Sequence, residues 1–216
     1  QAGGMSLCID HYAADPRLIL SAHVIPGHWL LQGGTTGGGG ALKWLREQIC
    51  PELSFTQMSD LADTVPAGSD DVLFLPYMAG ERSPIWNPDA CGVFFGLSYA
   101  KTRAHMIRAV MEGVGYALRH NLEVARAAGT QVGTLRAMGG SANSLVWTQI
   151  KADITGQTIE VPASDTATTL GAAILAGVGV GVFESFASAV AQTVAVRRLH
   201  QPNSARRSIY AQGYMK

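Results

Sequence analysis

Residues 33–44 read GGTTGGGGALKW, a glycine-rich turn that leads directly into a helical pattern. After the turn, Leu42, Leu45 and Ile49 recur at helical spacing, so we expect a helix over residues 41–50. Glycine has no Cβ, so its backbone lets a ligand approach closely, and the free N–H groups at a helix N-terminus attract anions. The stretch therefore predicts a turn and a helix start that can hold an anion.

A second glycine turn, Gly139-Gly140, stands between a predicted strand (134–138) and a predicted helix (144–155). Neither turn fits a standard pattern. The first lacks the G-K-[ST] ending of a P-loop, and it lacks the acidic residue about twenty positions on that a dinucleotide site requires. Taken alone, each turn is explained by tight turning and close helix–strand packing. Because both lie at strand-to-helix junctions, a phosphate or nucleotide site is an equal alternative.

Predicted strands and helices alternate after residue 33, which indicates an α/β protein. The longest helix is expected over about residues 102–128, with Thr102 as its N-cap and Gly129 as its stop. Three earlier strands predict an antiparallel meander, at residues 5–9, 18–24 and 29–33. No internal repeat, low-complexity run or linker divides the sequence, so we expect one domain over residues 1–216.

The 216 residues are 47% apolar and 15% charged, with 16 basic and 16 acidic residues. This composition excludes intrinsic disorder. The balanced charge gives no electrostatic support for binding nucleic acid or an acidic membrane.

Cys8, Cys50 and Cys91 are odd in number and form no C-x-x-C pair, which argues against a disulfide framework or a zinc site and favours a reducing cytoplasm. The uncharged run 166–183 is rich in Ala, Gly and Thr, so we expect a buried helix and a turn rather than a membrane span.

Several polar residues have both a structural and a functional interpretation. Asp165 is expected to cap a helix, with contact to a ligand cation as the alternative. Glu81 and Arg82, in a loop rich in Pro and Gly, predict either a structural ion pair or a pair that lines a cleft. Glu112, inside the long helix, indicates a solvated face or an internal ion pair.

Aromatic and metal-binding residue types give weaker signals. Trp44 and Trp147 each follow a glycine turn by a few residues, and we expect packing anchors rather than stacking platforms. The six histidines are scattered, and neither an H-E-x-x-H nor a G-x-S-x-G pattern occurs. We therefore predict no metal site.

Five blocks together form a recognisable pattern over about residues 1–200: Gly39-Gly40-x-Leu42-Lys43-Trp44; Gly80-Glu81-Arg82-Ser83-Pro84 with Asn87-Pro88; Gly92-Val93-Phe94-Phe95-Gly96-Leu97, followed after seven residues by His105-Met106-x-x-Ala109-Val110-Met111-Glu112; Gly139-Gly140-x-x-x-Ser144-x-x-Trp147-x-Gln149-x-x-Ala152-Asp153; and Leu170-Gly171-Ala172-Ala173-x-Leu175-Ala176. With these blocks the sequence resembles the C-terminal domain of the FGGY family of carbohydrate kinases, especially its xylulokinase-like branch.

The resemblance implies an actin-like, ribonuclease H-like ATPase domain, in which helices flank a mixed sheet. It implies ATP-dependent phosphorylation of a hydroxyl of a small sugar or polyol, with ATP and Mg²⁺ as cofactors. By position, Gly39 and Lys43 are expected near the ATP phosphates. The residues expected beside the adenine and ribose are Gly139, Gly140, Asn143 and Ser144.

The resemblance also implies a partner domain. The family's N-terminal domain holds most of the sugar site and the catalytic aspartate, and we expect that sugar-binding domain to be absent here. Asp10 lies too far along the first strand to replace the aspartate. No catalytic residue is therefore assigned, and the isolated chain is expected to be inactive. Its expected partners are ATP or ADP, its own N-terminal domain and a second copy that covers the apolar patch left by that domain.

Two alternatives stay open at this point. One is a fragment of another actin-like ATPase, such as a relative of acetate kinase or of an activator ATPase, although the block from Gly92 to Glu112 argues against it. The other is a non-catalytic interaction module whose glycine turns serve packing alone. The sugar is not identified, because the specificity residues lie mostly in the absent half.

Overall fold

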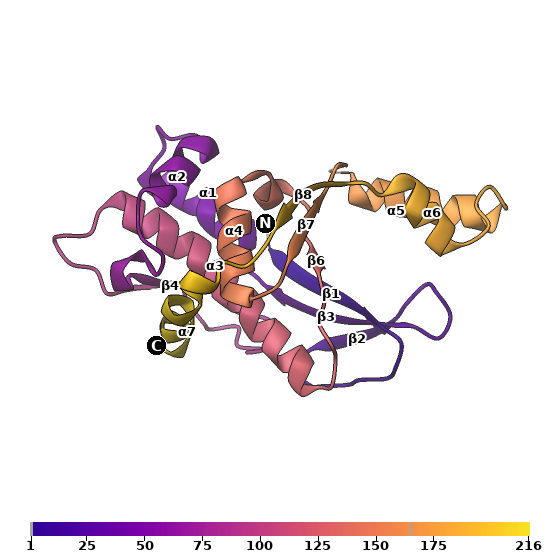
Figure 1. Cartoon of the computed structure of the whole chain (residues 1–216). Helices are drawn as coiled ribbons and strands as arrows, with labels where there is room; N and C mark the ends of the chain where they lie inside the picture. The colour runs from indigo at the N-terminus through magenta and orange to yellow at the C-terminus, as the bar shows by residue number, and fades with distance from the viewer. Residues whose placement is uncertain (1, 165) are drawn as a thin grey trace.

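Figure 1 shows a computed structural model of the chain, which describes residues 2–164 and 166–216. The helices in these residues are α1 (Gly38–Ile49), α2 (Phe55–Asp63), α3 (Arg103–Ala127), α4 (Leu145–Thr155), α5 (Ala167–Gly179), α6 (Phe186–Thr193) and α7 (Arg207–Met215). The strands are β1 (Gly3–Ile9), β2 (Ile19–Ala22), β3 (Trp29–Thr35), β4 (Leu73–Leu75), β5 (Val93–Phe95), β6 (Leu135–Arg136), β7 (Ile159–Pro162) and β8 (Val196–His200). The α/β class is confirmed, while β5 and α7 were not predicted.

The strands form three sheets. One has the order β1-β3-β2 and is antiparallel, the second is the antiparallel pair β4-β5, and the third has the order β6-β7-β8. In the third sheet β6 and β7 are parallel, while β7 and β8 are antiparallel. A mixed sheet was expected, and the sheet β6-β7-β8 is mixed. The other strands of the described residues belong to separate antiparallel sheets.

The predicted meander is wrong in its strand order, although its antiparallel sense is confirmed. A meander would place β2 in the middle, whereas β3 takes that place and pairs with β1 on one side and β2 on the other. The reason is burial. Leu31, Gly33 and Thr35 of β3 are buried at every second position, while no residue of β2 is buried. The strand with the more buried face occupies the centre of the sheet.

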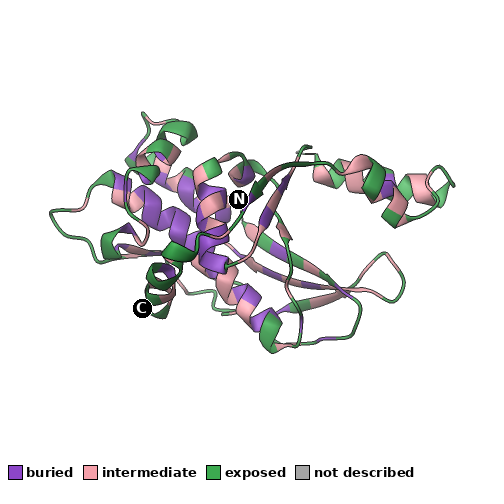
Figure 2. Ribbon diagram, viewed as in Figure 1, coloured by how far each residue is buried: buried purple, intermediate pink, exposed green. Residues whose placement is uncertain are grey.

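Helix α3 is the centre of the core, as the purple residues in Figure 2 show. Thr102 stands at its N-cap as predicted, where the backbone N–H of Thr102 donates to Nδ1 of His105 at 3.1 Å. Two glycines let other elements approach the helix. A Cβ on Gly113 would collide with the carbonyl oxygen of Phe74 in β4, and one on Gly115 would lie 2.7 Å from Cδ1 of Ile154 in α4. The backbone of α3 therefore packs directly against the backbone of Phe74 at one glycine and against the side chain of Ile154 at the other.

The C-terminal helix α7 is joined to α3 by a buried polar cluster. Nε of Arg108 donates to Oε1 of Glu112 at 2.8 Å, and this ion pair is almost completely buried. The hydroxyl of Tyr210 donates to the same Glu112 oxygen at 3.1 Å and accepts from Arg108 at 2.9 Å. Burial raises the pKa of Glu112, and its ionic partner Arg108 opposes that shift. The internal ion pair expected for Glu112 is thus confirmed.

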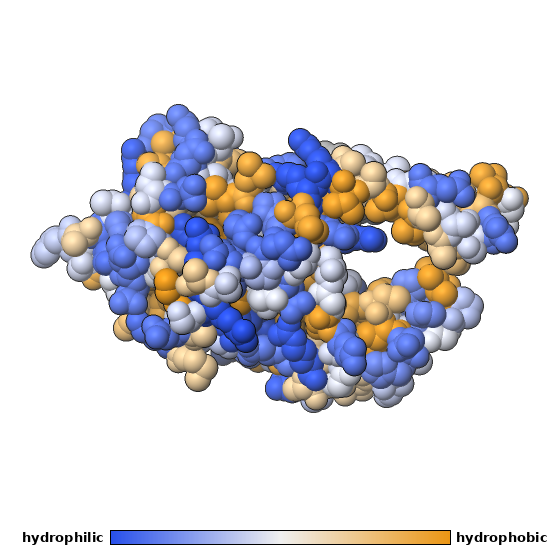
Figure 3. Space-filling model, in the orientation of Figure 1, coloured by the Kyte–Doolittle hydropathy of each residue, from blue (hydrophilic) through white to orange (hydrophobic). Residues whose placement is uncertain are grey.

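Helices α5 and α6 extend away from the rest of the chain (Figure 1), so the expectation of a buried helix over residues 166–183 is wrong. In α5 only Ile174 is buried, and in α6 only Ala189. Apolar residues are visible on this arm in Figure 3. Among the residues that the structure describes, no helix combines the length and the apolar character that crossing a membrane demands. The cap expected at Asp165 lies outside the described residues.

Lys151 of α4 places an amino group inside the fold. Its Nζ donates to Oγ of Ser141 at 2.8 Å and lies 4.6 Å from the centre of the Trp147 ring. Burial lowers the pKa of Lys151 from 10.5 to about 8. The folded state consequently carries a penalty for the charged lysine at neutral pH.

We predict that Tyr210→Phe destabilises the fold by about 1–3 kcal/mol, because Glu112 and Arg108 each lose a buried hydrogen-bond partner. The free energy of unfolding is measured by urea denaturation. Tyr12→Phe is the matched control, since Tyr12 is 68% exposed. Equal stability of the two variants would show that α7 does not depend on the cluster.

A pH prediction follows from Lys151. Between pH 8 and 10.5 the folded state is mostly neutral at Lys151 while the unfolded state still binds the proton, so the stability from this residue rises with pH. Lys151→Met removes this dependence and is more stable than the unchanged protein at pH 7. The advantage shrinks as the pH rises to 10.5. Urea denaturation at each pH measures it, with the exposed Lys43→Met as control, and an advantage that does not change with pH would contradict the assignment.

Candidate functional site

The two glycine turns face one pocket of about 690 Å³, a volume usual for small-molecule sites. Its walls come from the start of α1, from α2 and from the segment around residues 138–147. All six residues that the sequence predicts for the nucleotide line it: Gly39, Lys43, Gly139, Gly140, Asn143 and Ser144. The tertiary structure thus brings together two turns that lie about a hundred positions apart in the sequence.

The N-terminus of α1 supplies backbone donors to this pocket. Gly37 is its N-cap residue, no side chain caps the helix, and its first turn holds no acidic residue. The first N–H groups of an uncapped helix have no partner within the helix, and together with the helix dipole they attract negative charge. Gly39, which lies in this first turn, lines the pocket. The helix start can therefore bind an anion there.

A buried carboxylate holds the turn that precedes α1. Glu81 accepts hydrogen bonds from Oγ1 of Thr35 at 2.6 Å and from the backbone N–H of Thr36 at 3.1 Å. Its only contact with Arg82 in the described structure is with the backbone N–H, at 2.6 Å. The structural ion pair expected for Glu81 and Arg82 is therefore wrong, because the Glu81 carboxylate instead accepts hydrogen bonds from the glycine-rich turn before α1. The alternative, a pair that lines a cleft, stays a prediction.

Packing explains Gly37 and Gly38 of the first glycine turn but neither glycine of the second. A Cβ on Gly37 or Gly38 would collide with the backbone of Pro76 or Gly3. At Gly139 and Gly140, by contrast, no described protein atom lies within 4 Å of the position of a Cβ. The backbone of Gly139 has a φ of +81°, which favours glycine at that position. Gly140 does not have a positive φ, so its backbone does not require glycine. An open face at Gly140 is what the approach of a ligand requires.

The hydroxyl of Ser144 is already engaged with other groups of the protein. Ser144 is the N-cap of α4, where its Oγ accepts from the backbone N–H of Trp147 at 3.1 Å and lies 3.0 Å from Oγ of Ser59. Asn143 is exposed at the pocket. The side chain of Lys43 is 61% exposed, with its Nζ 3.7 Å from Oε1 of Glu47. Lys43 and Asn143 can turn toward a ligand, while the hydroxyl of Ser144 is already used to cap the N-terminus of α4.

One wall of the pocket was not predicted. Four residues of α2 line it, namely Phe55, Thr56, Ser59 and Asp60. The helix itself begins at Phe55, directly after its N-cap residue Ser54. The missed signal is a capping box, in which Ser54 accepts from Gln57 N at 3.2 Å and the Gln57 side chain accepts from Ser54 N at 2.8 Å.

The two tryptophans pack as expected. Trp147 is 3% exposed, belongs to the core around α3, and donates from Nε1 to the carbonyl oxygen of Met111 at 2.9 Å. Trp44 is partly buried against the same core. Trp147 also forms the inner side of the pocket, so one residue anchors α4 and supports the site.

Carboxylates are scarce at the pocket. Asp60 is the one acidic residue among the described residues that line it. Nowhere in the described ranges do three or more His, Cys, Asp or Glu side chains gather as a metal site would require. A divalent cation at this pocket would need most of its ligands from elsewhere.

Comparisons with known proteins agree on one family. The sequence model of the FGGY family of carbohydrate kinases, C-terminal domain, matches residues 13–180. The xylulose kinase of Staphylococcus epidermidis is 34% identical over 200 residues, and the gluconokinase of Bacillus subtilis is 37% identical over 213. Each alignment covers 93% of this chain, but the chain spans only 40% and 41% of the two relatives.

The fold agrees with solved structures as well. The crystal structure of xylulose kinase from Rhodospirillum rubrum superposes with a TM-score of 0.90 at 33% identity, over 99% of this chain and 43% of that one. The family match covers well over half of the sequence. The chain therefore belongs to the FGGY family of carbohydrate kinases, in the region of the family's C-terminal domain.

Proposed function

We propose that this chain is the nucleotide-binding part of an ATP-dependent sugar kinase. The observation that carries the proposal is the open backbone at Gly140, which faces the same pocket as the uncapped N-terminus of α1. One side of the pocket offers amide donors for phosphate, and the other offers a surface free of side chains. The kinase relatives give the chemistry that such a site would serve.

In this proposal the nucleotide lies across the pocket from α1 to α4. The phosphates lie at the first-turn amides of α1, and Lys43 swings from Glu47 toward them. The adenosine lies along Gly139 and Gly140, with Asn143 within reach and the α2 wall opposite. Backbone donors held in advance by the fold stabilise developing charge without reorganisation.

Mg²⁺ fits this site only as part of the nucleotide. Magnesium is usually held by one or two carboxylates together with substrate phosphates and waters, and the described pocket offers Asp60 alone. We therefore propose that Mg²⁺ enters on the phosphates, where it would supply neutralisation of their charge. The residues of this chain bind and orient the nucleotide around it.

The proposed reaction of the whole protein is transfer of the γ-phosphoryl group to a hydroxyl of a small sugar or polyol, a xylulose-like substrate. Such transfer depends on positioning and charge stabilisation more than on covalent chemistry. The general base and most of the sugar contacts would come from the protein's own N-terminal domain, and closure of the two domains would exclude water.

Two further proposals concern the setting of the protein. A reducing cytoplasmic location suits the three cysteines, which form no disulfide in the described structure. A homodimer is proposed as a second kind of partner, beside the N-terminal domain, because apolar residues of the α5–α6 arm such as Leu175, Val180 and Val182 are exposed.

We predict that the chain binds ADP and that Gly140→Val weakens the affinity at least tenfold while the fold is retained. The valine would occupy space that no described protein atom fills, so it would block the ligand and not the core. Isothermal titration calorimetry measures the binding. Gly171→Val is the matched control, because Gly171 is equally open but lies outside the pocket. No heat with the unchanged chain at millimolar ADP would favour the non-catalytic module.

A second prediction concerns turnover. The chain alone shows no sugar phosphorylation with D-xylulose or D-gluconate, because the proposed base belongs to another domain. A coupled assay of ADP release measures the rate, with a sugar-free reaction as control for background hydrolysis. Robust sugar-dependent turnover would mean that this chain carries its own base and that the division of labour is wrong.

A further inference from the structure

Ser141 lies between two cavities. It follows Gly140 in the second glycine turn, and it lines both the nucleotide pocket and an adjoining cavity of about 700 Å³. Gly39, in the first turn of α1, lines both of them as well. Ser141 and the start of α1 are therefore both at the junction of the two cavities, where the proposed phosphates lie.

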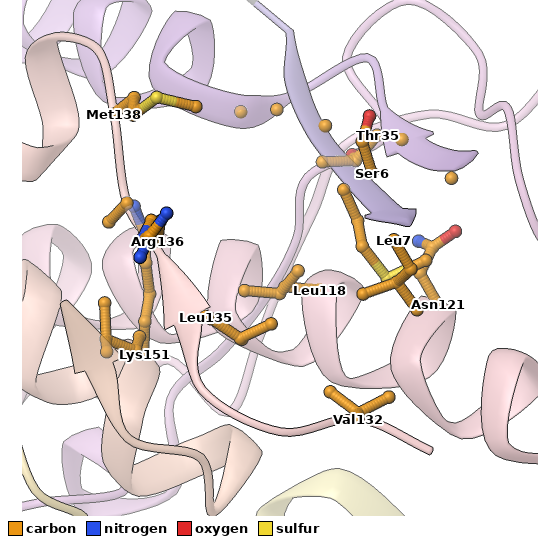
Figure 4. A pocket seen from close by; sticks show the side chains of 18 of the residues that line it. Ser6, Leu7, Thr35, Leu118, Asn121, Val132, Leu135, Arg136, Met138 and Lys151 are labelled. Carbon is orange, nitrogen blue, oxygen red and sulfur yellow. The ribbon is translucent and has the colours of Figure 1, made fainter. Parts of the chain in front are cut away.

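The hydroxyl of Ser141 is bonded to the amino group of Lys151. Nζ of Lys151 donates to Oγ of Ser141 at 2.8 Å, and in the described structure this is the only hydrogen bond of either side chain. Lys151 lines the adjoining cavity, where Figure 4 shows it on the same side as Arg136, but it does not line the nucleotide pocket. Lys151 therefore reaches a bound nucleotide through Ser141.

The surroundings of Lys151 do not neutralise its charge. Arg136 of β6 and Glu160 of β7 are the other charged residues among the described ones that line the adjoining cavity, and they pair with each other at 3.1 Å. The residues of α3 that line it are uncharged. Arg198 of β8 adds a second cation, which donates to the carbonyl oxygen of Ala142 in the same turn. Burial is the one cause that lowers the pKa of Lys151, to about 8.

The proton on Lys151 decides which way the Ser141 hydroxyl can donate. A charged ammonium group is a donor only, so Oγ of Ser141 accepts from it and the O–H of Ser141 is left to donate to another group. A neutral amine has a lone pair, which can accept that same O–H. Loss of the lysine proton can therefore withdraw the hydroxyl from a ligand at the junction.

We propose that Ser141 is a further nucleotide-binding residue and that Lys151 is its positioning residue. With Lys151 protonated, the O–H of Ser141 donates to a phosphate oxygen of the nucleotide. With Lys151 neutral, the O–H turns to Nζ and that contact is lost. Because the bound anion also favours the charged lysine, nucleotide binding takes up a proton at Lys151. The inference rests on the proposed nucleotide binding and adds a pH dependence to it.

Calorimetric titration with ADP tests the proposal on the alkaline side of pH 7, where phosphate has already lost its last proton, near pH 6. We expect the affinity to fall about fivefold to tenfold between pH 7 and pH 9.5. At pH 8.5, titrations in two buffers of different ionisation enthalpy should show uptake of about half a proton. Unfolding would not explain the loss, because the stability contributed by Lys151 rises over the same range.

Variants identify the titrating group, since Lys43 and Asp60 also line the pocket. Ser141→Ala should bind ADP at both pH values with the weak affinity of the unchanged chain at pH 9.5. Lys151→Met should bind with one affinity at both pH values. Lys151→Arg keeps a donor-only cation and should retain the tight affinity at pH 9.5.

The matched controls are Ser98→Ala and Lys101→Met, which lie outside both cavities and should keep the pH dependence. Absence of ADP binding at either pH would overturn the proposed nucleotide site and this inference with it. Equal affinity at both pH values without proton uptake would overturn the roles of Ser141 and Lys151 alone. A pH dependence that survives in Lys151→Met or Ser141→Ala would overturn them too, because another group would then titrate.

Discussion

Burial of α3 on nearly all sides is the constraint on which the rest of the structure depends. The helix packs against β4 through Gly113 and against α4 through Gly115. Tyr210 of α7 is hydrogen-bonded to the Arg108–Glu112 ion pair of α3. Trp147 connects the start of α4 to the α3 carbonyl at Met111. Because the start of α4 forms one wall of the pocket, the position of that wall is set by contacts with α3.

The opposite wall is held by a different interaction. The Glu81 carboxylate binds the turn before α1 at Thr35 and Thr36, and a buried carboxylate is costly unless such donors satisfy it. The arrangement leaves the first amides of α1 without a side-chain cap, at a helix start that begins in glycine. Helix starts are commonly capped by a side chain, so these uncapped amides beside a pocket are the feature on which the proposed anion site rests.

The divided sheet is the main departure from the expected architecture. An actin-like domain was expected to have a mixed sheet, and the described residues form two three-stranded sheets, which border one cavity, and a two-stranded sheet. The alternation of buried positions in β1 and β3 is regular, so these strands are not themselves irregular. A cavity lined by residues of β1, of β6 and of α3 lies between the two sheets.

The sequence by itself determined most of the local elements and which residues were candidates for the site. The apolar spacing and glycine turns placed α1, α3 and α4 within a few residues. The family resemblance then selected six candidate residues that line one pocket: Gly39, Lys43, Gly139, Gly140, Asn143 and Ser144. Their role toward a nucleotide stays a prediction. Only the tertiary structure decided matters that depend on distant contacts. A local capping box marks where α2 begins, but its place beside the pocket depends on long-range packing. The hydrogen bonds of Glu81 to the turn before α1, the central place of β3 and the exposure of α5 depend on long-range packing as well, which local residue patterns do not determine.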